Sequence, residues 1–160
     1  DPVFVELMAI YSKTGFRDLS ELGDKTVGTV QGYQWVKDLQ AIYGSKLKLY
    51  PTPVTALEDL KNGRVDAVLD AYTVGAYAKT QGSLPGIKIE ISGADPRVAT
   101  SMQPAQSAFL YDKNNVDLGT ALNAVIKEMH KNGQIAEILK SHGVTEDLAN
   151  VGDSRYVDAN

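Results

Sequence analysis

The chain has 160 residues, of which 43% are hydrophobic and 22% are charged, and its formal net charge is −4. This length predicts one globular domain or one and a fraction, and the lack of a basic cluster argues against a nucleic-acid partner. Without cysteine, a disulfide framework, a thiol nucleophile and a zinc–thiolate site are excluded. No apolar run approaches the roughly 18 residues that would span a membrane. The sequence starts at Asp1 with neither an initiator methionine nor a signal peptide, so we expect a processed chain or a fragment.

The first part of the chain alternates between strand and helix patterns. Apolar runs bounded by glycine or proline predict strands, and apolar residues three and four positions apart predict helices. Thr55 and Glu58 have the spacing of a capping box at the start of one helix. The predicted elements are a strand at 3–11, a helical turn at 18–22, a strand at 26–30, a helix at 33–42, a strand at 46–50, a helix at 55–62, a strand at 66–69, a helix at 73–80 and an edge strand at 87–91. This order predicts an α/β fold with a doubly wound, mostly parallel sheet.

The last third of the chain predicts a strand followed by two helices. Residues 93–106 have no regular pattern, and 107–111 read as a strand. Gly133 separates two amphipathic helices, and the polar tail at 145–160 is expected to be extended or frayed. The helices share a stripe of apolar residues, namely Leu118, Leu122, Val125, Ile126, Met129, Ile135, Ile138 and Leu139.

Two groups of polar residues follow predicted parallel strands. Gln31, Gly32, Tyr33 and Gln34 come after the strand at 26–30, and Asp70 comes after the strand at 66–69. Ligands of open α/β sheets bind beyond the carboxyl ends of the strands. Backbone amides at the following helix start attract anions, and a carboxylate can pair with a cation or a hydroxyl group.

Each of these residues also has a purely structural reading. The first group can be a tight turn that places Trp35 in the core. Asp70 can be the N-cap of the next helix, and Tyr72 can either contact a ligand or cover the crevice. The two histidines, His130 and His142, lie near predicted helix ends without a catalytic partner or second metal ligand at motif spacing. We therefore expect no catalytic residue, no metal and no cofactor.

Four segments together resemble the extracellular solute-binding proteins of family 3, the receptors of ABC importers for polar amino acids. They are residues 18–28, Gln31-Gly32, residues 56–68 and residues 132–143, and the similarity extends over residues 7–143. The resemblance implies a type II periplasmic-binding fold, in which two crossing strands join two α/β lobes and the ligand lies between them.

On this resemblance, 1–13 contains the first crossing strand and hinge, 14–105 the second lobe, and 106–160 the return strand and the C-terminal helices of an incomplete first lobe. The hinge would lie in 6–12 and 106–112. The absent part of the first lobe would include the arginine that usually holds the ligand carboxylate. This chain has Gly32-Tyr33-Gln34 where the family often has Gly-Thr-Thr, and the family's amine-binding aspartate aligns with Ala71.

The resulting prediction is a periplasmic or extracellular receptor, or a large fragment of one, that captures a small polar metabolite for an ABC importer. Its expected partners are the solute, a membrane permease, and either the missing first-lobe segment or a second copy of the chain, which would cover the apolar stripe. Two alternatives remain open: an extracytoplasmic sensing domain of a signalling receptor, and an enzyme on the same fold that dehydrates cyclic acids.

Overall fold

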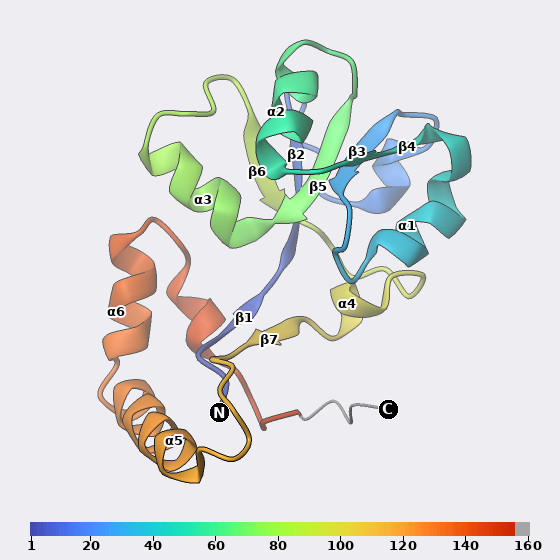
Figure 1. The fold of residues 1–160 in the computed structure, drawn as a ribbon. Coiled ribbons are helices and arrows are strands. Elements are labelled where there is room, and N and C mark those ends of the chain that lie inside the picture. Colours follow the sequence, from blue (N-terminus) through green and yellow to red (C-terminus); the bar gives the residue numbers. More distant parts are fainter. Residues whose placement is uncertain (156–160) are drawn as a thin grey trace. The chain divides into compact units, whose positions relative to one another are not determined.

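The computed structural model describes residues 1–155, and the chain forms two compact units (Figure 1). Unit 1 contains Asp1–Glu6 and the chain from Ala105 onward, and unit 2 is Leu7–Pro104. A single strand at 3–11 was predicted, but the run is two strands that belong to different sheets: β1 (Phe4–Glu6) in unit 1 and β2 (Met8–Ser12) in unit 2. The continuous apolar run did not reveal this division because both strands carry apolar residues.

Unit 2 is built on a five-stranded sheet in the order β4-β3-β5-β2-β6. β3 (Val27–Val30) is parallel to β4 (Leu47–Tyr50) and to β5 (Ala67–Ala71), whereas β2 is antiparallel to both β5 and β6 (Lys88–Ile91). All strands of this sheet except β2 therefore run in one direction. The predicted α/β fold with a mostly parallel sheet is confirmed, and β6 lies at the sheet edge as expected.

Side chains fill both faces of this sheet, as the period of two in a strand requires. In β2, Met8 and Ile10 join one apolar cluster, and Ala9 and Tyr11 join the other. The first cluster includes side chains from the turn η1 (Leu19–Leu22), from α1 (Val36–Tyr43) and from the loop before α4 (Ala99–Met102). The second includes residues of α2 (Pro53–Lys61), and Tyr72 and Ala78 of α3 (Tyr72–Thr80) pack against it. The sheet therefore has an apolar layer on each side.

The start of α2 differs from the prediction. The N-cap is Thr52, whose side chain accepts a hydrogen bond from the Thr55 amide at 3.3 Å, and Pro53 is in the first turn. Proline suits this position because its fixed φ matches the helix and its missing N–H would have no intrahelical partner there. The assignment of Thr55 as the cap, with Glu58 as its partner, was therefore wrong.

Unit 1 has a small sheet and a helical part. β1 pairs with β7 (Ala105–Ser107) in antiparallel register, with Phe4 opposite Ser107. The helices are α5 (Val116–Lys131) and α6 (Gln134–Ser141), and a short helix η3 (Glu146–Ala149) follows. The strand predicted at 107–111 was wrong: β7 ends at Ser107, and Leu110 beyond it is fully exposed. The tail was expected to be extended, but η3 buries Leu148; its last residues, 156–160, lie outside the described part.

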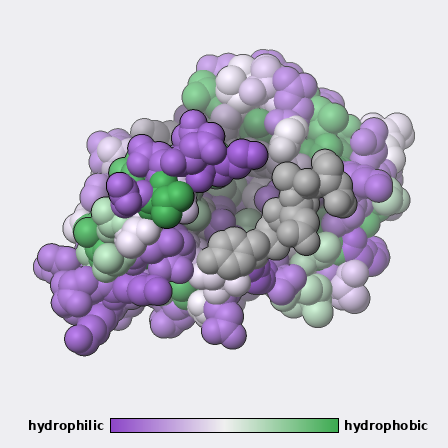
Figure 2. Space-filling view, turned by 60° about the horizontal axis from the view of Figure 1, so that its bottom comes forward, coloured by the Kyte–Doolittle hydropathy of each residue, from purple (hydrophilic) through white to green (hydrophobic). Residues whose placement is uncertain are grey.

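The apolar stripe of α5 and α6 is only partly covered. Ile126, Ile135 and Leu139 are buried, whereas Leu118, Val125 and Ile138 are exposed. Exposed hydrophobic residues also appear among hydrophilic ones on the face of the molecule in Figure 2. No helix in the described part of the chain is long and apolar enough to cross a membrane.

Candidate functional site

The candidate site lies in unit 2, where β3 and β5 end and their chains turn into α1 and α3. The turn after β3 begins with Gln31, whose amide donates to the Tyr50 carbonyl at the end of β4 (2.9 Å). Gly32 has a φ of 86°, a left-handed conformation that glycine adopts without steric penalty. The turn closes with the Tyr33 amide facing the Val30 carbonyl at 3.4 Å. The sequence Gln31-Gly32 is therefore the local reason why Tyr33 comes next to the end of β3.

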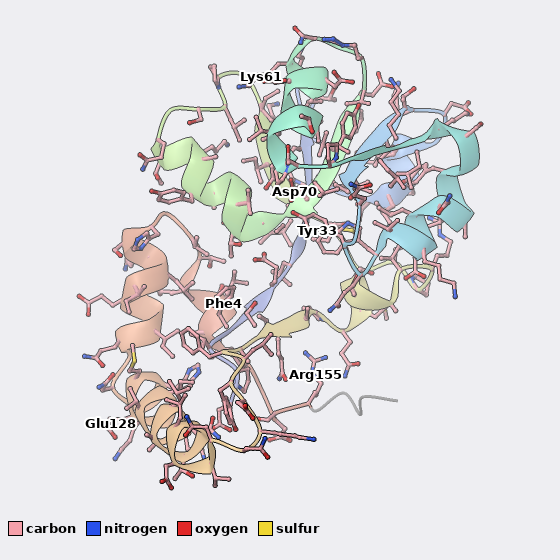
Figure 3. The ribbon with its side chains drawn as sticks, in the orientation of Figure 1. Phe4, Tyr33, Lys61, Asp70, Glu128 and Arg155 are labelled. Carbon is pink, nitrogen blue, oxygen red and sulfur yellow. The ribbon has the colours of Figure 1, made fainter. Side chains whose placement is uncertain are left out.

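Tyr33 and Asp70 meet at this edge, as Figure 3 shows. The Tyr33 hydroxyl donates to Oδ1 of Asp70 at 2.8 Å, and the Ala71 amide donates to the same oxygen at 2.7 Å. The Asp70 side chain is fully buried, and its other oxygen, Oδ2, has no hydrogen-bond partner. The carboxylate thus has one oxygen that accepts two hydrogen bonds and one buried oxygen that accepts none.

Burial raises the pKa of Asp70 above its ordinary value, and the hydrogen bonds from Tyr33 and Ala71 act in the opposite direction. The net direction is upward because removing a carboxylate from water disfavours its charged form. An additional donor at Oδ2 would favour the charged form. A donor from a bound molecule would reach Oδ2 only if neighbouring side chains moved, because this oxygen is buried.

A hydrogen-bonded chain behind the site holds Tyr33 in place. Trp35 Nε1 donates to Thr29 Oγ1 at 3.0 Å, and Thr29 Oγ1 donates to the Leu69 carbonyl at 2.8 Å. The Trp35 ring meets the Tyr33 ring edge-on, with centroids 5.0 Å apart. The prediction that Trp35 is a core residue is confirmed, since it is buried in the first cluster. Sequence reasoning missed Thr29, although a hydroxyl between Gly28 and Val30 in an apolar strand could have indicated a buried hydrogen bond.

The other predicted site residues are less closely assembled. Gln31, Gly32 and Gln34 are exposed in the turn. Tyr72 is half-buried, packs against the second apolar cluster, and donates its amide to the Leu7 carbonyl at 2.8 Å. Asp70 is not the N-cap of α3, because it lies within β5 and the cap position belongs to Ala71.

Both histidines belong to unit 1, whereas these residues belong to unit 2. His130 Nε2 lies 3.1 Å from the Pro2 carbonyl in unit 1, and His142 is the residue that follows α6. Among residues 1–155, no group of three or more histidine, cysteine, aspartate or glutamate side chains is arranged to hold a metal ion.

No protein-family model matches the chain, and no curated protein matches it. Several solved structures do match the chain. The second substrate-binding domain of a putative amino acid ABC transporter from Streptococcus pneumoniae is 22% identical, covers 90% of this chain and 64% of its own, and has a TM-score of 0.66. The arginine-, lysine- and histidine-binding protein ArtJ from Geobacillus stearothermophilus is 24% identical, covers 88% of this chain and 60% of its own, and has a TM-score of 0.61. An ancestral arginine-binding protein bound to glutamine is 30% identical, covers 88% of this chain and 61% of its own, and has a TM-score of 0.59.

The chain therefore has the fold predicted from its sequence, that of a lobe of the type II periplasmic-binding class. The solved proteins that share this fold include substrate-binding proteins of amino acid ABC transporters and the GluR0 ligand-binding core in complex with L-glutamate, so the fold implied by the resemblance is confirmed. The chain spans 60–64% of the length of the three structures described above.

Proposed function

We propose that this chain is a solute-binding receptor, or the larger part of one, that captures a small polar solute for an ABC importer. The fold supports this class of function. The observation that links this function to a site is the buried Asp70 carboxylate, whose Oδ2 has no hydrogen-bond partner and which lies at the carboxyl end of β5 beside the turn after β3. A buried polar atom without a partner costs free energy, so a bound donor at Oδ2 is stabilising.

The solute that fits best carries a hydrogen-bond donor, preferably a cationic one, and is an amino acid or a compound of similar size. The amides of Gln31 and Tyr33 already face the Tyr50 and Val30 carbonyls, so the carboxylate is the stronger recognition group at this edge. Gln31, Gly32, Tyr33 and Gln34 would line the bound solute on the β3 side, and Tyr72 would flank it on the α3 side. Recognition of this kind needs no cofactor.

The same proposal extends to location and partners. A receptor of an ABC importer works in the periplasm or outside the cell and delivers its solute to a membrane permease. The exposed apolar residues of unit 1 would be covered by a first-lobe segment that this sequence lacks or by a second copy of the chain, because water-exposed aliphatic surface favours burial.

A thermal-shift screen of the chain against the twenty amino acids, polyamines and small hydroxy compounds tests the function. A solute at 100 times its dissociation constant should stabilise the folded chain by about 2.7 kcal/mol. The proposal requires this stabilisation for at least one solute and its loss in Asp70→Asn. Asp24→Asn is the matched control, since Asp24 is fully exposed beyond the opposite end of β3 and pairs with Lys46 at 2.6 Å. Equal stabilisation of both variants would reject the site.

A further inference from the structure

The tripeptide Lys-Asn-Gly occurs twice in the chain, as Lys61-Asn62-Gly63 and as Lys131-Asn132-Gly133. The first copy ends α2 in unit 2, the second ends α5 in unit 1, and in each copy the asparagine is the C-cap. The backbones match, since the ψ angles of the asparagines are −2° and 1° and the φ angles of the glycines are 70° and 80°. Each glycine amide donates to the carbonyl three residues earlier, at 3.1 Å for Gly63 and 3.2 Å for Gly133. The two copies therefore allow a matched comparison of their asparagine side chains.

The two asparagine side chains differ in what holds them. Asn132 is tied to the first residue of α6, because its Nδ2 donates to Gln134 Oε1 at 3.1 Å and its Oδ1 accepts from the Gln134 amide at 3.0 Å. Within residues 1–155, the side chain of Asn62 makes no hydrogen bond, and both Asn62 and Gly63 are exposed. The Asn62 side chain can therefore rotate onto the next peptide group, whereas that of Asn132 must first break two hydrogen bonds.

We propose that Asn62-Gly63 is a site of spontaneous deamidation in the folded chain and that Asn132-Gly133 is protected from this reaction. The Gly63 nitrogen loses its proton and attacks Cγ of Asn62, so that an N–Cγ bond forms, the Cγ–Nδ2 bond breaks and ammonia leaves with a proton. Water then opens the five-membered imide at either carbonyl, giving aspartate or isoaspartate. Glycine favours the ring closure because it has no Cβ beside the attacking nitrogen. The last helical turn must open for the reaction, and helix ends open readily.

The product places a negative charge close to cationic side chains. Gly63 lines a cavity of about 210 Å³ together with Lys13 and Lys25. Lys13 Nζ donates to the carbonyl of Lys61, the residue before the asparagine, at 2.9 Å. A negative charge is unfavourable at the C-terminal end of a helix, and these ammonium groups offset that effect. The modified chain therefore stays folded with one more negative charge. The asparagine precedes β5, whereas Asp70 lies near the other end of that strand, so the reaction does not depend on solute binding.

The test follows the amide signals of Gly63 and Gly133 in one isotope-labelled sample of the 160-residue chain in mildly alkaline buffer. Each signal is replaced by a new one as its asparagine reacts. In urea the two asparagines should react at similar rates, because the lysine before each and the glycine after each are the same. In the folded chain Asn62 should react about 10-fold faster than Asn132, because the hydrogen bonds of Asn132 must break first.

Two variants sharpen this comparison. Gln134→Ala removes the acceptor of Asn132 Nδ2, so Asn132 should react several-fold faster while the rate of Asn62 stays the same. Gln40→Ala, at an exposed glutamine of α1, is the matched control and should change neither rate. The inference is overturned if Asn132 reacts as fast as Asn62 in the folded chain, if Asn62 keeps its amide while both asparagines react in urea, or if Gln134→Ala leaves the rate of Asn132 unchanged. The comparison within the wild-type sample stands as a test even where a variant does not fold.

Discussion

Unit 2 and unit 1 differ in the sheets that their hydrophobic residues cover. Unit 2 closes an apolar cluster over each face of a five-stranded sheet, whereas the sheet of unit 1 has two strands of three residues each. Unit 1 also leaves Phe109, Leu110 and Val116 exposed. Isolated two-stranded sheets are marginal in water, so we attribute most of the stability of the chain to unit 2. The candidate site residues Tyr33 and Asp70 therefore lie in the unit with the larger sheet and the two packed clusters.

The largest expected contrast between the units comes from shortening one leucine in each. Leu69 of unit 2 is fully buried, and Leu110 of unit 1 is 99% exposed. Leu69→Ala should lower the free energy of unfolding by about 2–5 kcal/mol, because a cavity is left in a packed cluster. Leu110→Ala should change it by less than about 0.5 kcal/mol. Urea unfolding, followed by circular dichroism, measures both, and equal effects would remove the contrast between the units.

A second contrast compares one helical glycine in each unit. A methyl group at Gly75 in α3 would overlap the ring of Tyr11, which is fully buried and hydrogen-bonded to the Ala71 carbonyl. A methyl group at Gly119 in α5 would meet Tyr111, which is 44% exposed and free to turn aside.

Alanine is favoured over glycine in a helix by about 1 kcal/mol, so the sign of each change depends on the neighbouring tyrosine. Gly75→Ala should destabilise the chain by about 1–3 kcal/mol through overpacking. Gly119→Ala should be neutral or slightly stabilising. Thermal unfolding midpoints of the two variants decide the matter, and a stabilising Gly75→Ala would show that the second cluster of unit 2 is looser than described.

The hydrogen-bonded chain behind the site gives a third contrast. Thr29→Val removes the acceptor of Trp35 Nε1 and should cost about 1–3 kcal/mol, because a buried donor is left without a partner. Thr29→Ser keeps the hydroxyl and should recover most of this loss. In unit 1, Thr120 is exposed on α5, so Thr120→Val should have little effect. The emission of Trp35, the single tryptophan, should shift in Thr29→Val and stay as in the wild type in Thr120→Val.

The smallest expected effect is a pH dependence of unit 2 that Asp70 causes. Burial raises the pKa of Asp70 in the folded chain above its ordinary value. The folded chain therefore binds this proton more tightly than the unfolded chain, so stability falls as the pH rises from about 4 through the folded pKa. Asp70→Asn lacks this loss. The variant should therefore be more stable relative to the wild type at pH 7 than at pH 4, measured as the difference in their free energies of unfolding. A difference that is constant with pH would contradict the raised pKa of Asp70.

The sequence predicted the elements of unit 2 well because each has a local signal. The apolar strand at 26–30, the glycine after α2 and the alternation in β4 are all short-range patterns. What it did not predict depends on distant partners. Nothing local shows that the apolar run at 3–11 divides at Leu7 between two sheets, or that β2 runs against its neighbours.

The site was predictable only to the level of a sheet edge. Gln31, Gly32, Tyr33, Gln34 and Asp70 were expected at one edge because they follow parallel strands, and the structure brings Tyr33 and Asp70 into hydrogen-bonding contact. The sequence could not show which oxygen of Asp70 lacks a hydrogen-bond partner, since that depends on the turn at Gly32 and on the Ala71 amide. Their roles in binding a solute remain predictions.

The central claim is that unit 2 binds a solute at the edge formed by Asp70 and the turn after β3. Amide chemical-shift mapping of the chain with the best solute from the thermal-shift screen tests it most directly. The account predicts that the largest changes fall on Gln31, Gly32, Tyr33 and Ala71, and that they disappear in Asp70→Asn but persist in Asp24→Asn. Largest changes on α5 and α6, around Met129 and Ile138, would contradict it and place the binding surface in unit 1 instead.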